Sequence, residues 1–215
     1  MTGLSWRELA ATTRSIGTVH ARFWNARKLS KIHRLPFHRY NRAHETKAHL
    51  RTFQKDCRSL LRSTEQSILP LAGVAISRAL LYCKTRPFTL LHGDLRADNL
   101  LFSKGRVFIV DWQIAAWGLG TFDLARVIGG SSRRPLSLPE QRKLVCIWHQ
   151  TLRRGGVQKY TLADAWQDYR VGVALTLSIP ITNGPTLTRL SLRGKNIARL
   201  MIRRFFKNGR EFGLI

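Results

Sequence analysis

A short polar loop with two aspartates constrains this chain more than any other feature. The segment LLHGDLRADNLLF, residues 90–102, places Asp94 directly after a His-Gly pair and Asn99 five residues later, between two apolar runs. Asp111 ends the next apolar run, RVFIV. Acidic residues number only 12 against 37 Lys and Arg, so their gathering here needs a chemical reason. Mg²⁺ is one, because it prefers carboxylate and other oxygen ligands together with the phosphates of a substrate.

The segments around the loop alternate between apolar runs and turn residues. FTLL at 88–91 predicts a strand that leads into the polar loop, and NLLF, SKG and RVFIVDW at 99–112 predict a β-hairpin with Gly105 at its turn. Most of the remaining chain has helical periodicity. Helices are predicted at residues 5–24, from about 41 onward, and at 68–84, 138–156, 161–179 and 193–212.

Two helices have clear predicted features. Ser5 and Glu8 form a capping-box pattern at the start of the first helix. Its expected buried face comprises Leu9, Thr13, Ile16, His20 and Phe23. The last helix is basic, and its expected apolar side comprises Ile197, Leu200, Met201 and Phe205.

The longest apolar stretch, residues 68–83, contains Arg78 and is predicted to be a buried helix too short to span a bilayer. Cys57, Cys83 and Cys146 are isolated and form no C-x-x-C pair, so neither a disulfide framework nor a zinc module is indicated. Without a signal-peptide pattern at the start, these features predict a cytoplasmic protein.

The linked motifs HGDLRADN, VFIVDW and GTFDLARVIGG resemble the C-terminal lobe of the aminoglycoside phosphotransferase and choline kinase superfamily, which has a protein-kinase-like fold. GTVHARFWN at 17–25 also resembles this family, and GGVQKYTLADAW resembles its ecdysteroid-kinase-like members. The similarity runs from about residue 10 to about 180. It implies an α+β fold, a mainly helical kinase-like lobe with a small β-hairpin insert that carries the catalytic loop.

The resemblance implies a role for each motif residue. Asp94 would be the catalytic base, Asn99 and Asp111 would ligate Mg²⁺, and His92 and Asp123 would support the loop. The alternatives are a structural loop aspartate for Asp94, a purely structural His92, and helix capping by Asp123. Variable positions of the motif hold Arg96 and Asp98, for which only a local ion pair is considered, and Gln113 replaces a common acid.

The domain prediction is one kinase-like lobe over residues 1–215. Within it lie an inserted basic segment at 26–58, the catalytic and metal loops at 88–125, and a helical remainder at 138–210. No strand and glycine-loop pattern precedes residue 88, so the N-terminal lobe of a kinase is predicted to be absent. A truncated gene product is the favoured explanation. A split kinase whose other lobe is a separate chain and a degenerate family member are the alternatives.

The predicted function is ATP- and Mg²⁺-dependent phosphorylation of a small-molecule hydroxyl, with activity of the lobe alone left open. Glu140, Asp164 and Asp168 are the only nearby acids outside the metal loop, so a neutral or anionic acceptor is expected rather than an aminoglycoside. The net charge of +25 favours an alternative, a non-catalytic protein that binds nucleic acid or anionic membrane. This alternative leaves the carboxylates unexplained, so neither partner is expected.

Overall fold

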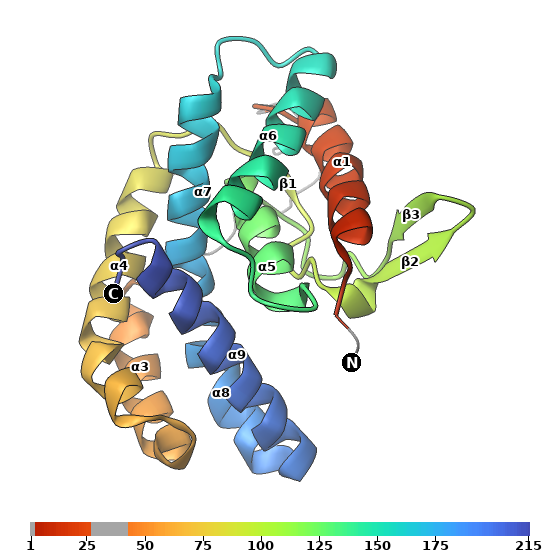
Figure 1. The fold of residues 1–215 in the computed structure, drawn as a ribbon. Coiled ribbons are helices and arrows are strands. Elements are labelled where there is room, and N and C mark those ends of the chain that lie inside the picture. The colour runs from red at the N-terminus through yellow and green to blue at the C-terminus, as the bar shows by residue number, and fades with distance from the viewer. Residues whose placement is uncertain (1–2, 27–42) are drawn as a thin grey trace. The chain divides into compact units, whose positions relative to one another are not determined.

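A computed structural model describes residues 3–26 and 43–215 (Figure 1). Packing divides the described residues into two compact units, unit 1 with residues 3–26 and 85–172 and unit 2 with residues 43–84 and 173–215. The single domain expected from the sequence stays a prediction. Residues 27–42 of the basic segment predicted at 26–58 lie outside the described residues.

Unit 1 combines helices with two small antiparallel sheets. Its described elements are α1 (Trp6–Arg22), β1 (Thr89–Leu91), the short 3₁₀ helix η2 (Ala97–Asn99), β2 (Leu100–Ser103), β3 (Arg106–Ile109), β4 (Ala116–Gly118), α5 (Thr121–Ser131), α6 (Leu138–Arg154) and most of α7 (Leu162–Thr176). The predicted mixture of many helices with a small β component is confirmed.

Helix α1 begins at the predicted capping box. The Ser5 backbone N–H donates to Glu8 Oε2 at 2.7 Å, and the Glu8 N–H donates to Ser5 Oγ at 3.3 Å. Leu9 and Ile16 are buried as expected, and α1 packs along α6 (Figure 1). His20, also on the buried face, lies next to α5 and becomes part of the site described below.

The predicted hairpin is confirmed. Strand β2 pairs with β3 in antiparallel register, with Leu100 opposite Ile109, and the turn residues Lys104 and Gly105 both have positive φ. Strand β1 pairs instead with β4, with Leu91 opposite Ala116. Strand β4 was not predicted, because three residues are too few to show an alternation.

Unit 2 is helical. Its described elements are α3 (Ala43–Cys57), the 3₁₀ helix η1 (Arg58–Leu60), α4 (Ser63–Cys83), the end of α7, α8 (Ser178–Leu190) and α9 (Leu192–Glu211). Phe53 of α3 and Phe206 of α9 are fully buried, with their ring centroids 6.4 Å apart. These aromatic rings help to form the core of the unit.

The apolar face predicted for α9 is wrong in part. The buried residues of the helix include Ala198, Ile202 and Phe206 along with the predicted Phe205, whereas Leu200 is 50% exposed. Apolar residues occur on both sides of this helix, and its packing against α8 decides which side is buried.

Helix α8 was not predicted as a separate helix. Its sequence contains Gly184 and Pro185, a pair that usually interrupts a helix. The helix forms because it packs against α3 and α9. A Cβ atom at position 184 would lie 3.0 Å from the Phe53 ring, so glycine allows this close approach.

Helix α4 corrects the prediction of a buried helix too short to span a bilayer. It begins at Ser63, where Glu65 accepts the Arg62 N–H at 2.8 Å, and its 21 residues extend about 30 Å. Within residues 3–26 and 43–215 it is the one helix long and apolar enough to cross a membrane, judged by length and composition alone. Only 28% of its apolar window is buried, and Leu71, Val74 and Leu81 are exposed. One such helix is weak evidence for a membrane span, since soluble core helices pass the same test.

Candidate active site

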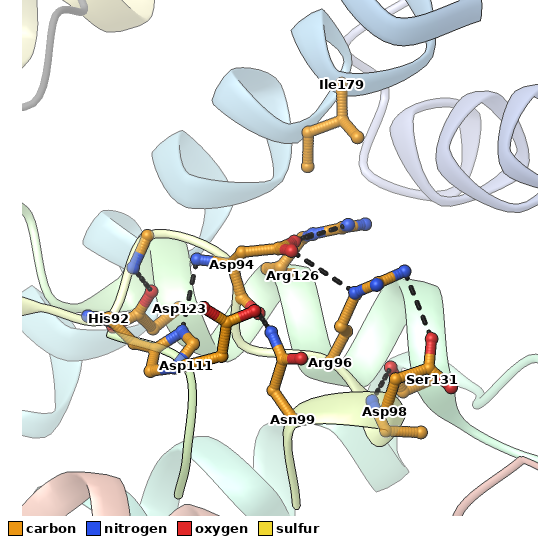
Figure 2. Close-up of polar contacts among 12 residues, drawn as sticks. His92, Asp94, Arg96, Asp98, Asn99, Asp111, Asp123, Arg126, Ser131 and Ile179 are labelled. Carbon is orange, nitrogen blue, oxygen red and sulfur yellow. Dashed lines mark hydrogen bonds and ion pairs between the residues drawn. The ribbon is translucent and has the colours of Figure 1, made fainter. Parts of the chain in front are cut away.

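The polar loop predicted to carry the chemistry connects β1 to β2 and is held at its start by Asp123 of α5. One carboxylate oxygen of Asp123 accepts the His92 backbone N–H at 2.7 Å, and the other accepts the Gly93 N–H at 3.0 Å (Figure 2). The Asp123 side chain is fully buried. Because the backbone N–H groups of two consecutive residues donate to this one carboxylate, Asp123 fixes the path of the chain that leads into Asp94.

Two residues distant in sequence complete the surroundings of Asp123. The indole N–H of Trp148 donates to His20 Nδ1 at 3.0 Å, and His20 Nε2 lies 3.3 Å from the Asp123 carboxylate. Since Nδ1 accepts this hydrogen bond, Nε2 carries the hydrogen of the neutral ring and donates a hydrogen bond to Asp123. From the sequence, His20 was expected on a buried face and lies in the family-like segment GTVHARFWN, but no role was assigned to it. Its polarity on that face and its place in the segment were the available signals.

His92 links the loop to the end of β3. Its Nδ1 accepts the Asp94 backbone N–H at 3.3 Å, and its Nε2 donates to the Val110 carbonyl at 2.8 Å. The ring also meets Trp112 edge-on, with centroids 4.8 Å apart. Both ring nitrogens of this buried side chain are engaged within the protein, which is an arrangement suited to holding loop geometry.

Asn99 and Asp111 lie together where the hairpin meets the loop. The Val110 N–H donates to the Asn99 carbonyl at 3.0 Å, which continues the β2–β3 ladder and places Asp111 one residue beyond it. Asn99 Nδ2 donates to the Asp94 carbonyl at 2.9 Å. Figure 2 shows the side chains of Asp94, Asn99 and Asp111 around this stretch of loop.

The pair of Asn99 and Asp111 fits a hard divalent cation. The Asn99 amide nitrogen is used by the loop, so its oxygen is the atom left to accept or to ligate. The Asp111 carboxylate is exposed, and its one described hydrogen bond, from Gln113, is long at 3.5 Å. In the described part of the chain no three His, Cys, Asp or Glu side chains converge as a metal site. Mg²⁺ needs no such cluster, because water and substrate phosphates supply most of its ligands.

The Asp94 carboxylate is held by two arginines. Oδ1 accepts hydrogen bonds from Arg126 Nε at 3.2 Å and Nη2 at 2.8 Å, and Oδ2 lies 3.2 Å from Arg96 Nε. Arg96 also pairs with Asp98 at 3.1 Å, the local ion pair considered from the sequence. The Asp94 side chain remains 31% exposed, so a small molecule can reach it.

Arg126 is the clearest residue that sequence reasoning missed. It lies in α5 and is 8% exposed, and burial lowers the pKa of its guanidinium while the charge of Asp94 raises it. An arginine stays charged even so. Its position three residues after Asp123, on the helix that fixes the loop, was the available signal. The site is thus a surface-accessible carboxylate oriented by a buried cation.

Gly93 gives a prediction about loop geometry. Its φ is +84°, and an added Cβ would lie 2.6 Å from the Ile114 carbonyl oxygen. Gly93→Ala is expected to lower the free energy of unfolding by about 2–4 kcal/mol, from backbone strain together with steric overlap. Urea denaturation measures this change.

Gly105→Ala is the matched control, because Gly105 also has a positive φ, +75°, but nothing lies within 4 Å of its added Cβ. It should cost about 1–2 kcal/mol from strain alone. Equal losses in the two variants would show that the contact with Ile114 is not restrictive.

Comparison with known proteins identifies the family of this chain. A model of the phosphotransferase enzyme family matches residues 5–168, which include α1, the loop, the hairpin and α5. No curated protein and no solved structure matches the chain. The match covers well over half of the 215 residues and confirms the resemblance found in the motifs. The chain therefore belongs to the phosphotransferase enzyme family.

Proposed function

We propose that this chain is the catalytic lobe of an ATP- and Mg²⁺-dependent kinase that transfers the γ-phosphoryl group of ATP to a hydroxyl of a small molecule. The observation that carries the proposal is the grouping of Asp94, Asn99 and Asp111 around one loop, whose path is held by the buried Asp123. Phosphotransferases act mainly by positioning and electrostatics, and a rigid loop with accessible oxygen ligands suits both.

Each residue has a separate task in this proposal. Asp94 accepts the proton of the attacking hydroxyl, and Arg126 keeps its carboxylate oriented. Asn99 and Asp111 offer the oxygens that hold Mg²⁺. When bound, the ion neutralises charge on the transferred phosphate. His92 and Asp123 are positioning residues, since both act on the loop backbone.

Binding of Mg²⁺ and ATP to the full chain tests the proposal. Ligand at 100 times its Kd should stabilise the protein by about 2.7 kcal/mol. For a chain of this size, each kcal/mol raises the melting temperature by about 2–4 °C. Asp111→Ala should abolish this rise because it removes the carboxylate ligand. Calorimetry or a dye-based melting curve measures it.

Asp98→Ala serves as the matched control, because it removes from the same loop a carboxylate whose described ion pair is with Arg96. It should keep the rise in melting temperature. An unchanged rise in Asp111→Ala, or none in the unmodified chain, would contradict the proposal.

The acceptor is proposed to be neutral or anionic. The acids that could hold a cationic antibiotic are already occupied: Arg86 bridges Asp164 at 2.9 Å and Asp168 at 2.8 Å, and Arg134 pairs with Glu140. Tyr160 also donates to Asp168 at 2.8 Å. We expect no phosphorylation of kanamycin in a radiolabelled ATP assay, and phosphorylation of kanamycin would contradict this assignment.

Two further predictions concern a partner chain and the cellular location. The family match gives no support to a separate chain that carries the other lobe. A cytoplasmic location remains a proposal, and its support is that Cys57, Cys83 and Cys146 form no disulfide within the described residues.

A further inference from the structure

A basic pocket in unit 2 has no part in the function proposed above. It has a volume of about 670 Å³, within the size range of small-molecule sites. It is formed by the end of α3 and by η1 together with the residues that start α4. Its lining consists of Arg51, Gln54, Lys55, Arg58, Leu61 and Gln66.

The packing of α3 fixes the direction of the pocket's cations. Phe53 and Cys57 are fully buried on the other side of the helix. They pack closely against α8 there because Gly184 has no side chain. Arg51 and Lys55 lie one helical turn apart on the exposed side. The helix α3 cannot rotate without exposing these core residues, so Arg51 and Lys55 are held at the pocket, and Arg58 joins them from η1, which follows α3 directly.

No described carboxylate of unit 2 neutralises these cations. Asp56 pairs with Arg189, Glu65 accepts the Arg62 N–H at 2.8 Å, and Glu211 lies 3.7 Å from Lys207. Among residues 48–84 and 173–215, no ion pair or hydrogen bond is described for the side chain of Arg51, Lys55 or Arg58. Like charges in one concavity repel one another, and a bound anion would relieve this repulsion.

We propose that this pocket binds a small molecule that carries two or more phosphate groups. Three cations match the charge of such a ligand, and guanidinium groups bind phosphate through paired hydrogen bonds. The Gln54 side chain offers an amide group for a further polar contact, whereas Gln66 Nε2 already donates to the Leu61 carbonyl at 3.4 Å. Leu61, 8% exposed, provides an apolar surface for the rest of the ligand. The pocket is partly open, and Arg51, Gln54, Lys55 and Arg58 are exposed, so the test below includes a short DNA duplex as a competing ligand.

Inorganic tripolyphosphate is the probe, titrated into the full chain by calorimetry with EDTA present so that no Mg²⁺ site takes part. The pocket variant is Arg51→Gln/Lys55→Gln/Arg58→Gln, which keeps helix-forming side chains. The control is Arg193→Gln/Lys195→Gln/Arg203→Gln on α9, which removes the same charges from exposed positions. The pocket variant should bind at least about 10-fold more weakly, equivalent to about 1.4 kcal/mol, and the control variant within about 3-fold of the unmodified chain.

Several outcomes would overturn the inference. Equal weakening in both variants would mean that net charge alone attracts the probe, and no binding by the unmodified chain would mean that there is no site. Preferential binding of a short DNA duplex would assign the surface to nucleic acid. If the pocket variant does not fold, Lys55→Gln alone should still weaken binding several-fold. Asp111→Ala should bind the probe normally, so the result is separate from that of the proposed kinase site.

Discussion

Replacing Asp94 with asparagine is expected to slow phosphoryl transfer by about 10²–10⁴-fold, the usual contribution of a general base. The amide cannot accept the proton of the attacking hydroxyl, but it is nearly the same size as the carboxylate and can still accept a hydrogen bond from Arg126. The loss should therefore appear in kcat rather than in the binding of ATP. Release of ADP from Mg²⁺-ATP in the presence of hydroxylated acceptors measures the rate.

Asp98→Asn is the control for this experiment, since Asp98 lies four residues further along the same loop and pairs with Arg96 instead of Arg126. Its rate should stay within about 3-fold of the unmodified protein, since a surface ion pair contributes little. If Asp94→Asn retained a comparable rate, Asp94 would be a structural residue of the loop and the proposed role would be wrong.

Asp123→Ala is expected to have the largest effect on stability, a loss of about 3–5 kcal/mol in the free energy of unfolding. The substitution leaves the buried N–H groups of His92 and Gly93 without an acceptor and removes the partner of His20. Urea denaturation at neutral pH, followed by circular dichroism, measures the change.

The exposed Asp98 again provides the comparison, because Asp98→Ala should change the free energy of unfolding by less than about 0.5 kcal/mol. A loss below about 1 kcal/mol for Asp123→Ala would show that water replaces the carboxylate and that the loop does not depend on it. If Asp123→Ala remains folded, its transfer rate should also fall, because the backbone that precedes Asp94 loses its anchor.

Local features of the fold could be predicted because neighbouring residues encode them. The capping box of α1 requires only Ser5 and Glu8, and the β2–β3 hairpin requires two apolar runs around a turn at Gly105. The predictions that failed concern which side of a helix is buried and where a helix begins or ends. Helix α9 has apolar residues on two sides, α8 contains a Gly-Pro pair, and α4 begins five residues before the predicted start at Ile68.

The sequence by itself determined the chemical proposal, because Asp94, Asn99 and Asp111 are set by their spacing along one loop and one hairpin. Only the tertiary structure revealed what surrounds them. Arg126 contacts Asp94 across 32 positions of sequence, and His20 reaches Asp123 across 103. Such contacts depend on which helix faces pack together, and no local pattern of residues records that choice.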